Sequence, residues 1–516
     1  MTQHQNADKS MDAKSMFNRA WNYQHGKGVT QDHKEAVQWY RKAVEAGHVP
    51  AMTSLGLCYK KGKGVTQDYA EAVQWYRKAA DAGDLWGMHN LGYCHKHGEG
   101  VPQDYTEAVR WFRKAADAGH ASSMTNLGLC YELGNGVPQD LTKAAEWYRK
   151  GAEAGDLWGM HNLGNCYGKG LGVSQDYAEA YKWYRKAAEK GHASSMNHLA
   201  LCYEYNRGVD QDYFKAANWY RKAAEAGNHW AMHNLGWCYQ HGAGLEIDYK
   251  EAVKWYRKAA DAGHASAMNR LGLCYKKGLG VSENYSEAVK WYRKAAEAGE
   301  VWGMHNLGWC CKTGEGVDRD YTESVKWYRK AAEAGHAPSM TGLGLAYENG
   351  DGVTQDMKEA VRWYRKAAEA EDLWGIHNLG WCCQYGMGVS QDLSAAVMWY
   401  RKAAKGGHAP SMTNLGWCYQ KGEGIALDIK QALKWFRKAA RAKNTCAMRN
   451  LGDCYREGIG VAQDYEEAFQ WYRKAAEAGD TEAMQEVARM YEEGLGVDRA
   501  YEQAQNWYDK AAQAET

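Results

Sequence analysis

The 516-residue chain has almost no net charge and no long apolar run. Its 64 lysine and arginine residues are matched by 63 aspartate and glutamate residues, which leaves a formal charge of +1. No chain-wide field therefore attracts nucleic acid or an anionic membrane surface. No stretch approaches the roughly 18 apolar residues of a membrane-spanning helix. These absences argue against a polyanion-binding protein and against an integral membrane protein.

A secretory signal and a disulfide framework are also missing. Residues 1–12 are polar and lack the apolar stretch of a signal peptide. Most of the 14 cysteines recur once per 36 residues at one fixed slot, as Cys58 and Cys94 do. Equivalent slots in stacked helical repeats lie about 8–10 Å apart, beyond the roughly 7 Å Cα limit of a disulfide. We therefore expect buried, reduced thiols and a cytoplasmic protein.

No catalytic or metal-binding constellation stands out from the periodic background of the sequence. Serine, histidine and aspartate do not gather at irregular positions as a nucleophilic site requires. The Gly-x-Gly-Val segments do not follow a predicted strand, so they do not match a phosphate-binding loop. Five histidines that recur two repeats apart are too distant to ligate one metal ion. We expect no enzymatic activity, no metal and no cofactor.

What the sequence does contain is one unit of 36 residues, written fourteen times without insertion or deletion. Repeats of this length form solenoids, in which each unit contacts only its neighbours. We expect one solenoid over residues 12–516 after a polar tail at residues 1–11. The end units should act as caps, because Arg19 replaces a core leucine and Glu482 makes the last unit polar. The pentapeptide Trp-Tyr-Arg-Lys-Ala begins at Trp75, Trp183, Trp219, Trp255, Trp291, Trp327, Trp363, Trp399 and Trp471, and Trp147 begins the same segment with Gly151 in place of the alanine.

Each unit predicts two antiparallel helices. Apolar residues of the second unit, including Leu55 and Cys58, recur at a spacing that only a helix places on one face. Gly62 then ends that helix, because glycine adopts the left-handed backbone of a helix C-terminus. Asp68 and Glu71 form the sequence pattern of a capping box, which predicts the start of a second helix.

A glycine recurs in the middle of the first helix. Glycine costs about 1 kcal/mol there relative to alanine, so its return requires a packing reason. We expect close approach of the neighbouring helix at these positions. They are Gly56, Gly92, Gly128, Gly164, Gly236 and Gly272.

The unit resembles a known family. Its pattern is Ala-Met-x-x-Leu-Gly-x-x-Tyr, then Gly-x-Gly-Val-x-x-Asp, then Glu-Ala-x-x-Trp-Tyr-Arg-Lys-Ala-Ala. This pattern resembles the Sel-one-like repeat, a relative of the tetratricopeptide repeats, over nearly the whole chain. The resemblance implies an all-α, right-handed superhelical solenoid that acts as a non-catalytic adaptor or scaffold for proteins or peptides. Relatives with two disulfide-bonded cysteines per unit differ from this chain, which mostly has one.

A second period of 72 residues places a tryptophan in alternate units only. A residue that the stacked core needed would instead appear in every unit. In the tetratricopeptide relatives, first-helix residues two and five positions to either side of the Leu-Gly leucine line a concave groove. The resemblance implies the same role here, and an asparagine follows each histidine. The candidate binding residues are Trp86, His89, Asn90, Tyr93, Trp158, His161, Asn162, Trp230, His233, Asn234, Trp237, Trp302, His305, Asn306, Trp309, Trp374, His377, Asn378, Trp381 and Trp417.

Several functions fit this aromatic groove. Tryptophan faces hold aliphatic stems or cations, and asparagine bonds a peptide backbone, which favours a protein or an extended peptide segment as partner. The alternative is a carbohydrate or a small aromatic or cationic ligand at each Trp-His-Trp cluster. Single-stranded RNA is a third reading, although groove positions such as Lys96 and Glu132 mix charges. Self-association also remains open, and so does simple packing of duplicated tryptophans.

Overall fold

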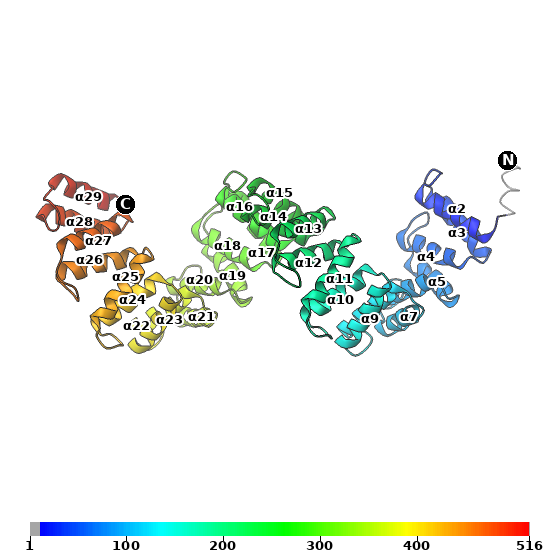
Figure 1. The fold of residues 1–516 in the computed structure, drawn as a ribbon, viewed down its shortest axis with the longest axis horizontal. Helices are drawn as coiled ribbons and strands as arrows, with labels where there is room; N and C mark the ends of the chain where they lie inside the picture. The colour runs from blue at the N-terminus through cyan, green and yellow to red at the C-terminus, as the bar shows by residue number, and fades with distance from the viewer. Residues whose placement is uncertain (1–10, 515–516) are drawn as a thin grey trace. The chain divides into compact units, whose positions relative to one another are not determined.

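The computed structural model describes residues 11–514, which form helices and no strand (Figure 1). Two antiparallel helices make up each repeat. The first helices are α2 (Ala13–His25), α4 (Val49–Lys61), α6 (Leu85–His97), α8 (Ala121–Leu133), α10 (Leu157–Lys169), α12 (Ala193–Glu204), α14 (His229–His241), α16 (Ala265–Lys277), α18 (Val301–Thr313), α20 (Ala337–Asn349), α22 (Leu373–Tyr385), α24 (Ala409–Lys421), α26 (Thr445–Glu457) and α28 (Thr481–Glu493).

The second helices of the repeats alternate with the first along the chain. They are α3 (His33–Glu45), α5 (Tyr69–Asp81), α7 (Tyr105–Asp117), α9 (Leu141–Glu153), α11 (Tyr177–Glu189), α13 (Tyr213–Glu225), α15 (Tyr249–Asp261), α17 (Tyr285–Glu297), α19 (Tyr321–Glu333), α21 (Met357–Glu369), α23 (Leu393–Lys405), α25 (Ile429–Arg441), α27 (Tyr465–Glu477) and α29 (Tyr501–Ala514). The predicted all-α solenoid of helix pairs is therefore confirmed.

The helix ends follow the predicted signals, with one correction. Gly62 ends α4 with φ 63°, in the left-handed region. Asp68 begins α5 by accepting a hydrogen bond from the backbone N–H of Glu71 at 3.0 Å. The second half of the predicted capping box is wrong, because the Glu71 carboxylate accepts instead from the indole Nε1 of Trp75 at 3.1 Å. This glutamate therefore orients the recurring tryptophan of its own helix.

The mid-helix glycine marks the closest approach of the two helices, as expected. A Cβ atom on Gly128 would lie 2.7 Å from Cδ1 of Tyr148, and one on Gly56 would lie 2.7 Å from Cε1 of Tyr76. Real Cβ atoms do not approach a ring so closely. In these two repeats the tyrosine of the second helix fills the space that the missing side chain leaves, and Tyr76 and Tyr148 are fully buried. The glycine and the tyrosine together set the spacing of the helix pair.

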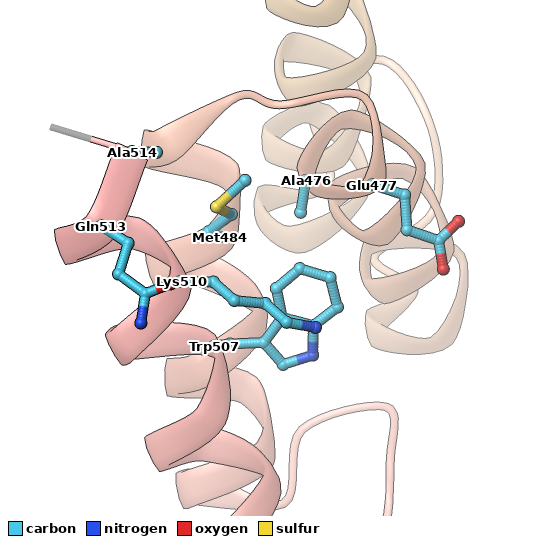
Figure 2. A pocket seen from close by; sticks show the side chains of 7 residues that line it. All are labelled: Ala476, Glu477, Met484, Trp507, Lys510, Gln513 and Ala514. Atoms are coloured by element: carbon cyan, nitrogen blue, oxygen red, sulfur yellow. The ribbon is translucent and has the colours of Figure 1, made fainter. Parts of the chain in front are cut away.

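The lysine and the arginine of the pentapeptide also have structural roles. The Lys78 ammonium lies over the indole of Trp75, 4.2 Å from the ring centre. The same contact occurs in the last helix, α29, where Figure 2 shows the Lys510 side chain running across Trp507. The Lys510 Nζ lies 4.3 Å from the centre of the indole. The Arg41 guanidinium donates to the hydroxyl of Tyr59 in the following repeat at 2.8 Å. The arginine thus links repeats, and the lysine covers the tryptophan.

The chain divides into two compact units, Met1–Ala262 and Gly263–Thr516, and the boundary follows α15. Within each unit, first helices of consecutive repeats contact one another, as α8 does α10 and α20 does α22. No two second helices in the described chain contact each other as extensively. The first helices therefore line the inner side of each unit. One continuous body over residues 12–516 stays a prediction, and the predicted tail lies outside the described residues except for Met11.

The two end repeats carry the expected cap residues. Arg19 of α2 lies over the indole of Trp39, 4.2 Å from the ring centre, and Trp39 is only 2% exposed. At the other end, Glu482 of α28 is exposed. A hollow of about 530 Å³ opens there between α27, α28 and α29, lined by Ala476, Glu477, Met484, Trp507, Lys510, Gln513 and Ala514 (Figure 2).

The cysteines are free and, apart from Cys446, buried. Burial raises the pKa of Cys58 to about 11, so its thiol is protonated at neutral pH. The adjacent Cys310 and Cys311 are both buried, and Cys311 occupies the slot that tyrosine fills in other repeats. Across the described residues, no helix is long and apolar enough to cross a membrane.

Two glycine substitutions test how closely the turns approach the backbone of the neighbouring repeat. A Cβ on Gly136 would lie 2.2 Å from the carbonyl oxygen of Tyr105, and its φ is 72°. Gly119 has φ 94° but no heavy atom within 4 Å of such a Cβ. We expect Gly136→Ala to lower the free energy of unfolding by about 3 kcal/mol or more, and Gly119→Ala by about 1 kcal/mol. Urea unfolding of both variants measures this, and equal effects would contradict it.

Candidate functional site

Five tryptophans at the start of alternate first helices are exposed on the inner side. Each is the second residue of its helix, and each leaves more than half of its side chain in solvent. The exposed fractions are 56% for Trp86, 56% for Trp158, 56% for Trp230, 53% for Trp302 and 57% for Trp374. Exposed indoles at a fixed slot are not needed for stacking the repeats. These residues therefore form a candidate contact surface, which we call the tryptophan ridges.

Aromatic residues further along the same helices add to this surface to different degrees. Trp309 is 44% exposed and Trp417 is 37% exposed. Tyr93, Trp237 and Trp381 are half-buried. The inner face is thus aromatic along the length of the first helices in each compact unit.

Four of the ridges rest on the histidine that begins the first helix of the next repeat. The two rings lie edge to face, so the histidine holds one side of the indole while more than half of the residue stays exposed to solvent. The ring centres are 4.6 Å apart for Trp86 and His120, 4.6 Å for Trp158 and His192, 4.4 Å for Trp302 and His336, and 4.5 Å for Trp374 and His408. The alternation of repeats in the sequence therefore has a structural basis, since one repeat supplies the indole and the next its support.

Four of the five groove histidines are held by hydrogen bonds within the protein, which their spacing in the sequence did not predict. His89 bonds the hydroxyl of Ser123 through Nδ1 at 3.0 Å, and His120 bonds the same hydroxyl at 2.9 Å. His161, which is 6% exposed, shares Ser195 with His192 in the same way. The same arrangement recurs at His305, Ser339 and His336 and at His377, Ser411 and His408.

We call these four groups the His-Ser-His clasps. In the first clasp, the backbone N–H of Ser123 donates to Nδ1 of His120 at 3.2 Å, so that nitrogen is unprotonated. The Nε2 atoms of His336 and His408 have no hydrogen-bond partner in the described structure. Their rings lie edge to face with Trp302 and Trp374, and an N–H directed at an indole accounts for this arrangement. The clasps therefore hold the ridges in place.

Burial keeps the clasp histidines neutral at physiological pH. It lowers the pKa of His89 to about 4, with a further contribution from His120, and the pKa of His161 to about 3. The pKa values of His305 and His377 are each lowered to about 4 for the same reason. These four histidines are therefore uncharged at pH 7.

The groove asparagines are half-buried, and some are engaged within the protein. The Asn234 amide donates to the side chain of Asn197 at 3.1 Å, and that of Asn306 donates to Asn269 at 2.8 Å. Asn90, Asn162 and Asn378 are also half-buried. His233 is half-buried beside Tyr256, with 5.6 Å between the ring centres. The asparagines thus brace neighbouring repeats as well as facing the groove.

A hollow of about 340 Å³ lies beside the Trp158 ridge. It is bounded by α6, α8 and α10, and its lining residues are His89, Ser122, Thr125, Asn126, Leu129, Asp156, Trp158 and Asn162. Asp156 is the one ionised group in this lining, because His89 is neutral. Lys96 lies just outside, 3.4 Å from the side-chain oxygen of Asn126. The hollow therefore combines an indole, a carboxylate and several amide and hydroxyl groups.

The carboxylate of this hollow was not among the candidate binding residues. Asp156 begins α10 and accepts from Ser122 at 2.9 Å and from Thr125 at 2.7 Å, both on α8. The Asp372 carboxylate accepts a hydrogen bond from the hydroxyl of Thr341 at 2.7 Å in the same way. The 72-residue alternation of aspartate and histidine at the helix starts was the available signal. A second hollow of about 160 Å³ is lined by Leu201, Glu204, Tyr205, His233, Asn234 and Trp237.

The described residues contain no group of three histidine, cysteine, aspartate or glutamate side chains that could hold a metal ion. What the arrangement offers is aromatic area, neutral hydrogen-bonding groups and single carboxylates. These groups suit reversible binding.

The comparison with protein families identifies the repeat. The model of the Sel1 repeat matches fourteen consecutive segments, the first at residues 13–48 and the last at residues 481–515. This chain belongs to the Sel1 repeat family. Proteins of this family are in general protein-interaction scaffolds.

Solved structures agree with this Sel1 assignment. A protective antigen present in uropathogenic Escherichia coli strains, which displays an SLR fold, is 31% identical and superimposes with a TM-score of 0.63. That match covers 93% of this chain and 96% of the antigen. A Sel1 repeat protein from Oxalobacter formigenes is also 31% identical, with a TM-score of 0.44, over 47% of this chain and 96% of its own length. The comparison with curated proteins gave no match.

The buried clasps of this Sel1 protein make its stability depend on pH. The unfolded chain binds protons at these histidines below about pH 6.5, whereas the folded chain does so only near pH 4. Stability is therefore fully present above pH 6.5 and falls as the pH drops toward 4. We expect the urea midpoint to decrease from pH 7.5 to pH 5.0, and to decrease less in a His89→Gln, His161→Gln variant.

A histidine outside the clasps provides the control for this experiment. His25 is exposed at the end of α2, so His25→Gln should leave the decrease between pH 7.5 and pH 5.0 unchanged. The account is wrong if the clasp variant and the His25 variant show the same pH dependence.

Proposed function

We propose that this protein is a non-catalytic scaffold that binds an extended protein segment along the inner face of each compact unit. The tryptophan ridges supply the contacts. The observation that carries the proposal is the exposure of five indoles at one fixed slot, each leaving more than half its side chain in water. Exposed aromatic clusters usually mark interaction surfaces, and tryptophan is enriched among the residues that dominate binding energy.

The His-Ser-His clasps make the ridges suitable for binding. An indole that is fixed on one edge loses little conformational freedom when a partner covers its open face. The Trp158 and His192 ring planes, for example, meet at 78° with centres 4.6 Å apart. We therefore infer that the clasp histidines position the ridges, while the indoles themselves contact the partner.

The hollow beside Trp158 suggests which group of a partner it accepts. Asp156 carries the local negative charge, and the indole of Trp158 forms one wall of the same hollow. Aromatic faces and carboxylates both attract cations. We propose that a lysine or arginine side chain of the bound segment enters here, with Asn162 free to bond the backbone of that segment.

A small ligand remains the second candidate, because a hollow of about 340 Å³ falls within the size range of small-molecule sites. Carbohydrates or small cationic molecules would need only one hollow, whereas an extended segment contacts more than one ridge. The two candidates therefore differ in how affinity depends on ligand length. We propose the cytoplasm as the compartment of either function, on the ground of the buried, unpaired thiols.

Removal of the ridges from the first unit tests the binding proposal. Random 12-residue peptides are selected against the parent protein by phage display, and the dissociation constants of the selected peptides are then measured. We expect the variant Trp86→Ala, Trp158→Ala, Trp230→Ala to bind at least 100-fold more weakly, because each buried indole contributes about 2 kcal/mol. Truncation of a peptide to four residues should also cost most of its affinity, whereas a small-ligand site would not need length.

Exposed apolar residues outside the groove supply the matched control. Phe214 is 64% exposed and Leu427 is 63% exposed, and neither lies on a first helix. The variant Phe214→Ala, Leu427→Ala should bind the selected peptides as the parent does. Equal loss of affinity in both variants, or none in either, would refute the groove as the binding surface.

Neutralising Asp156 tests the charge preference of the hollow. Asn228 and Asn444 begin α14 and α26 at the same slot and accept the same backbone N–H bond, so Asp156→Asn should fold. We expect this variant to bind lysine- or arginine-containing peptides about tenfold more weakly and neutral peptides equally well. Asp176→Asn removes a carboxylate at the start of α11, a slot that Asn284 fills in α17, and should have no effect. An unchanged affinity for basic peptides in Asp156→Asn contradicts this assignment.

A further inference from the structure

Two pairs of consecutive repeats share an ion pair that the fifth and sixth repeats lack. In each, the lysine five positions after the Leu-Gly leucine contacts a glutamate in the turn of the next repeat. Lys60 Nζ lies 2.7 Å from Glu99 Oε2, and Lys276 Nζ lies 2.7 Å from Glu315 Oε2. The equivalent positions in the fifth and sixth repeats hold Gly168 and Arg207. A glycine therefore replaces the lysine, and a cation replaces the carboxylate.

The missing side chain leaves an open hollow of about 160 Å³. Its lining includes Gly168, Lys169, Tyr177, Tyr184 and Arg207. The glycine is not required by packing, because a Cβ there would lie 3.6 Å from the Tyr184 hydroxyl and 3.8 Å from Ala180 Cβ. Backbone geometry does not require it either, since Gly168 lies within α10 and has no positive φ. The absence of a side chain at Gly168 instead creates space beside Arg207.

The chain around Arg207 also departs from the other repeats. α12 ends at Glu204, so it has 12 residues where the other first helices have 13. Asn206 follows in the left-handed conformation with φ 54°, a position that glycine holds in the other repeats. The Arg207 guanidinium lies beside the rings of Tyr177 and Tyr205, 5.7 and 5.3 Å from their centres. These rings hold the guanidinium at the rim of the hollow.

The hollow is positively charged. Lys169 and Arg207 both line it, and no carboxylate does. Neither cation forms an ion pair with the described acidic side chains. His198, which also lines the hollow, has its pKa lowered by burial and further by Lys169, so it is neutral at pH 7. The Tyr184 hydroxyl is already committed as a donor to Asn165 at 2.7 Å. Two cations and open space thus remain without an anionic partner.

We propose that this hollow is an oxyanion site that takes a carboxylate or a phosphate group between Lys169 and Arg207. The guanidinium would present paired N–H donors to two oxygens, which is the geometry that arginine offers to carboxylates and phosphates. The ammonium of Lys169 adds a second, mobile charge. This site does not depend on the tryptophan ridges, so it stands or falls separately from the proposed groove function.

Calorimetric titration of the full chain tests the site with two probes, inorganic phosphate and glutarate, at constant ionic strength. The two arms distinguish the sources, since phosphate reports a phosphorylated ligand and glutarate an acidic side chain. We expect saturable binding of at least one probe. Arg207→Gln should weaken it at least tenfold, and Arg207→Lys should weaken it less, because it keeps the charge but loses the paired N–H donors.

A double variant rebuilds the closed form that other repeats contain. Gly168→Lys, Arg207→Glu recreates the ion pair of Lys60 with Glu99, fills the hollow and should fold, as circular dichroism would show. It should abolish binding of both probes. The matched control is Lys276→Gln, Glu315→Gln, which removes an existing pair elsewhere and should leave binding unchanged. The proposal is overturned if the parent binds neither probe, or if the double variant binds as the parent does.

Discussion

The close contact between the first and second helices of a repeat underlies the whole structure. In most repeats a glycine of the first helix meets a tyrosine of the second, and at Gly128 and Tyr148 a single added carbon atom would come within 2.7 Å of the ring. This contact fixes the spacing of the helix pair and buries the tyrosine. Because it lies on the core face with Leu127 and Cys130, the opposite face of the first helix is released from packing. The inner surface can therefore vary without loss of the fold.

On that face, side chains of one repeat are held by side chains of the next repeat. One repeat supplies an indole and a histidine, and the next supplies a histidine and a serine that hold them, as with Trp86, His89, His120 and Ser123. A single repeat cannot make this arrangement. The functional period is consequently two repeats, although the packing period is one. The residues that pack the fold therefore recur every 36 residues, whereas the residues proposed for binding recur every 72.

The sequence predicted the fold closely and the site only in part. Helix pairs, the glycine contact and the exposure of Trp86 follow from spacings within one unit, which periodicity reveals. The histidines were predicted to face the groove, but their burial depends on Ser123 and His120 of the next repeat, which the helical spacing of one unit does not report. The hollow at Gly168 was missed for the same reason. Gly168 and Arg207 are 39 residues apart, and their departure from the Lys60 and Glu99 pair is seen only when equivalent pairs of positions are compared.

The central claim is that the indoles at the start of alternate first helices are the surface that a partner covers. The most direct measurement is the ¹⁹F NMR spectrum of the protein labelled with 5-fluorotryptophan, recorded with and without a selected peptide. Trp86, Trp158 and Trp230, assigned by single substitutions, should shift on saturation, while the second-helix tryptophans such as Trp75 and Trp147 should not. Shifts confined to the second-helix tryptophans, with the ridge signals unchanged, would contradict the account.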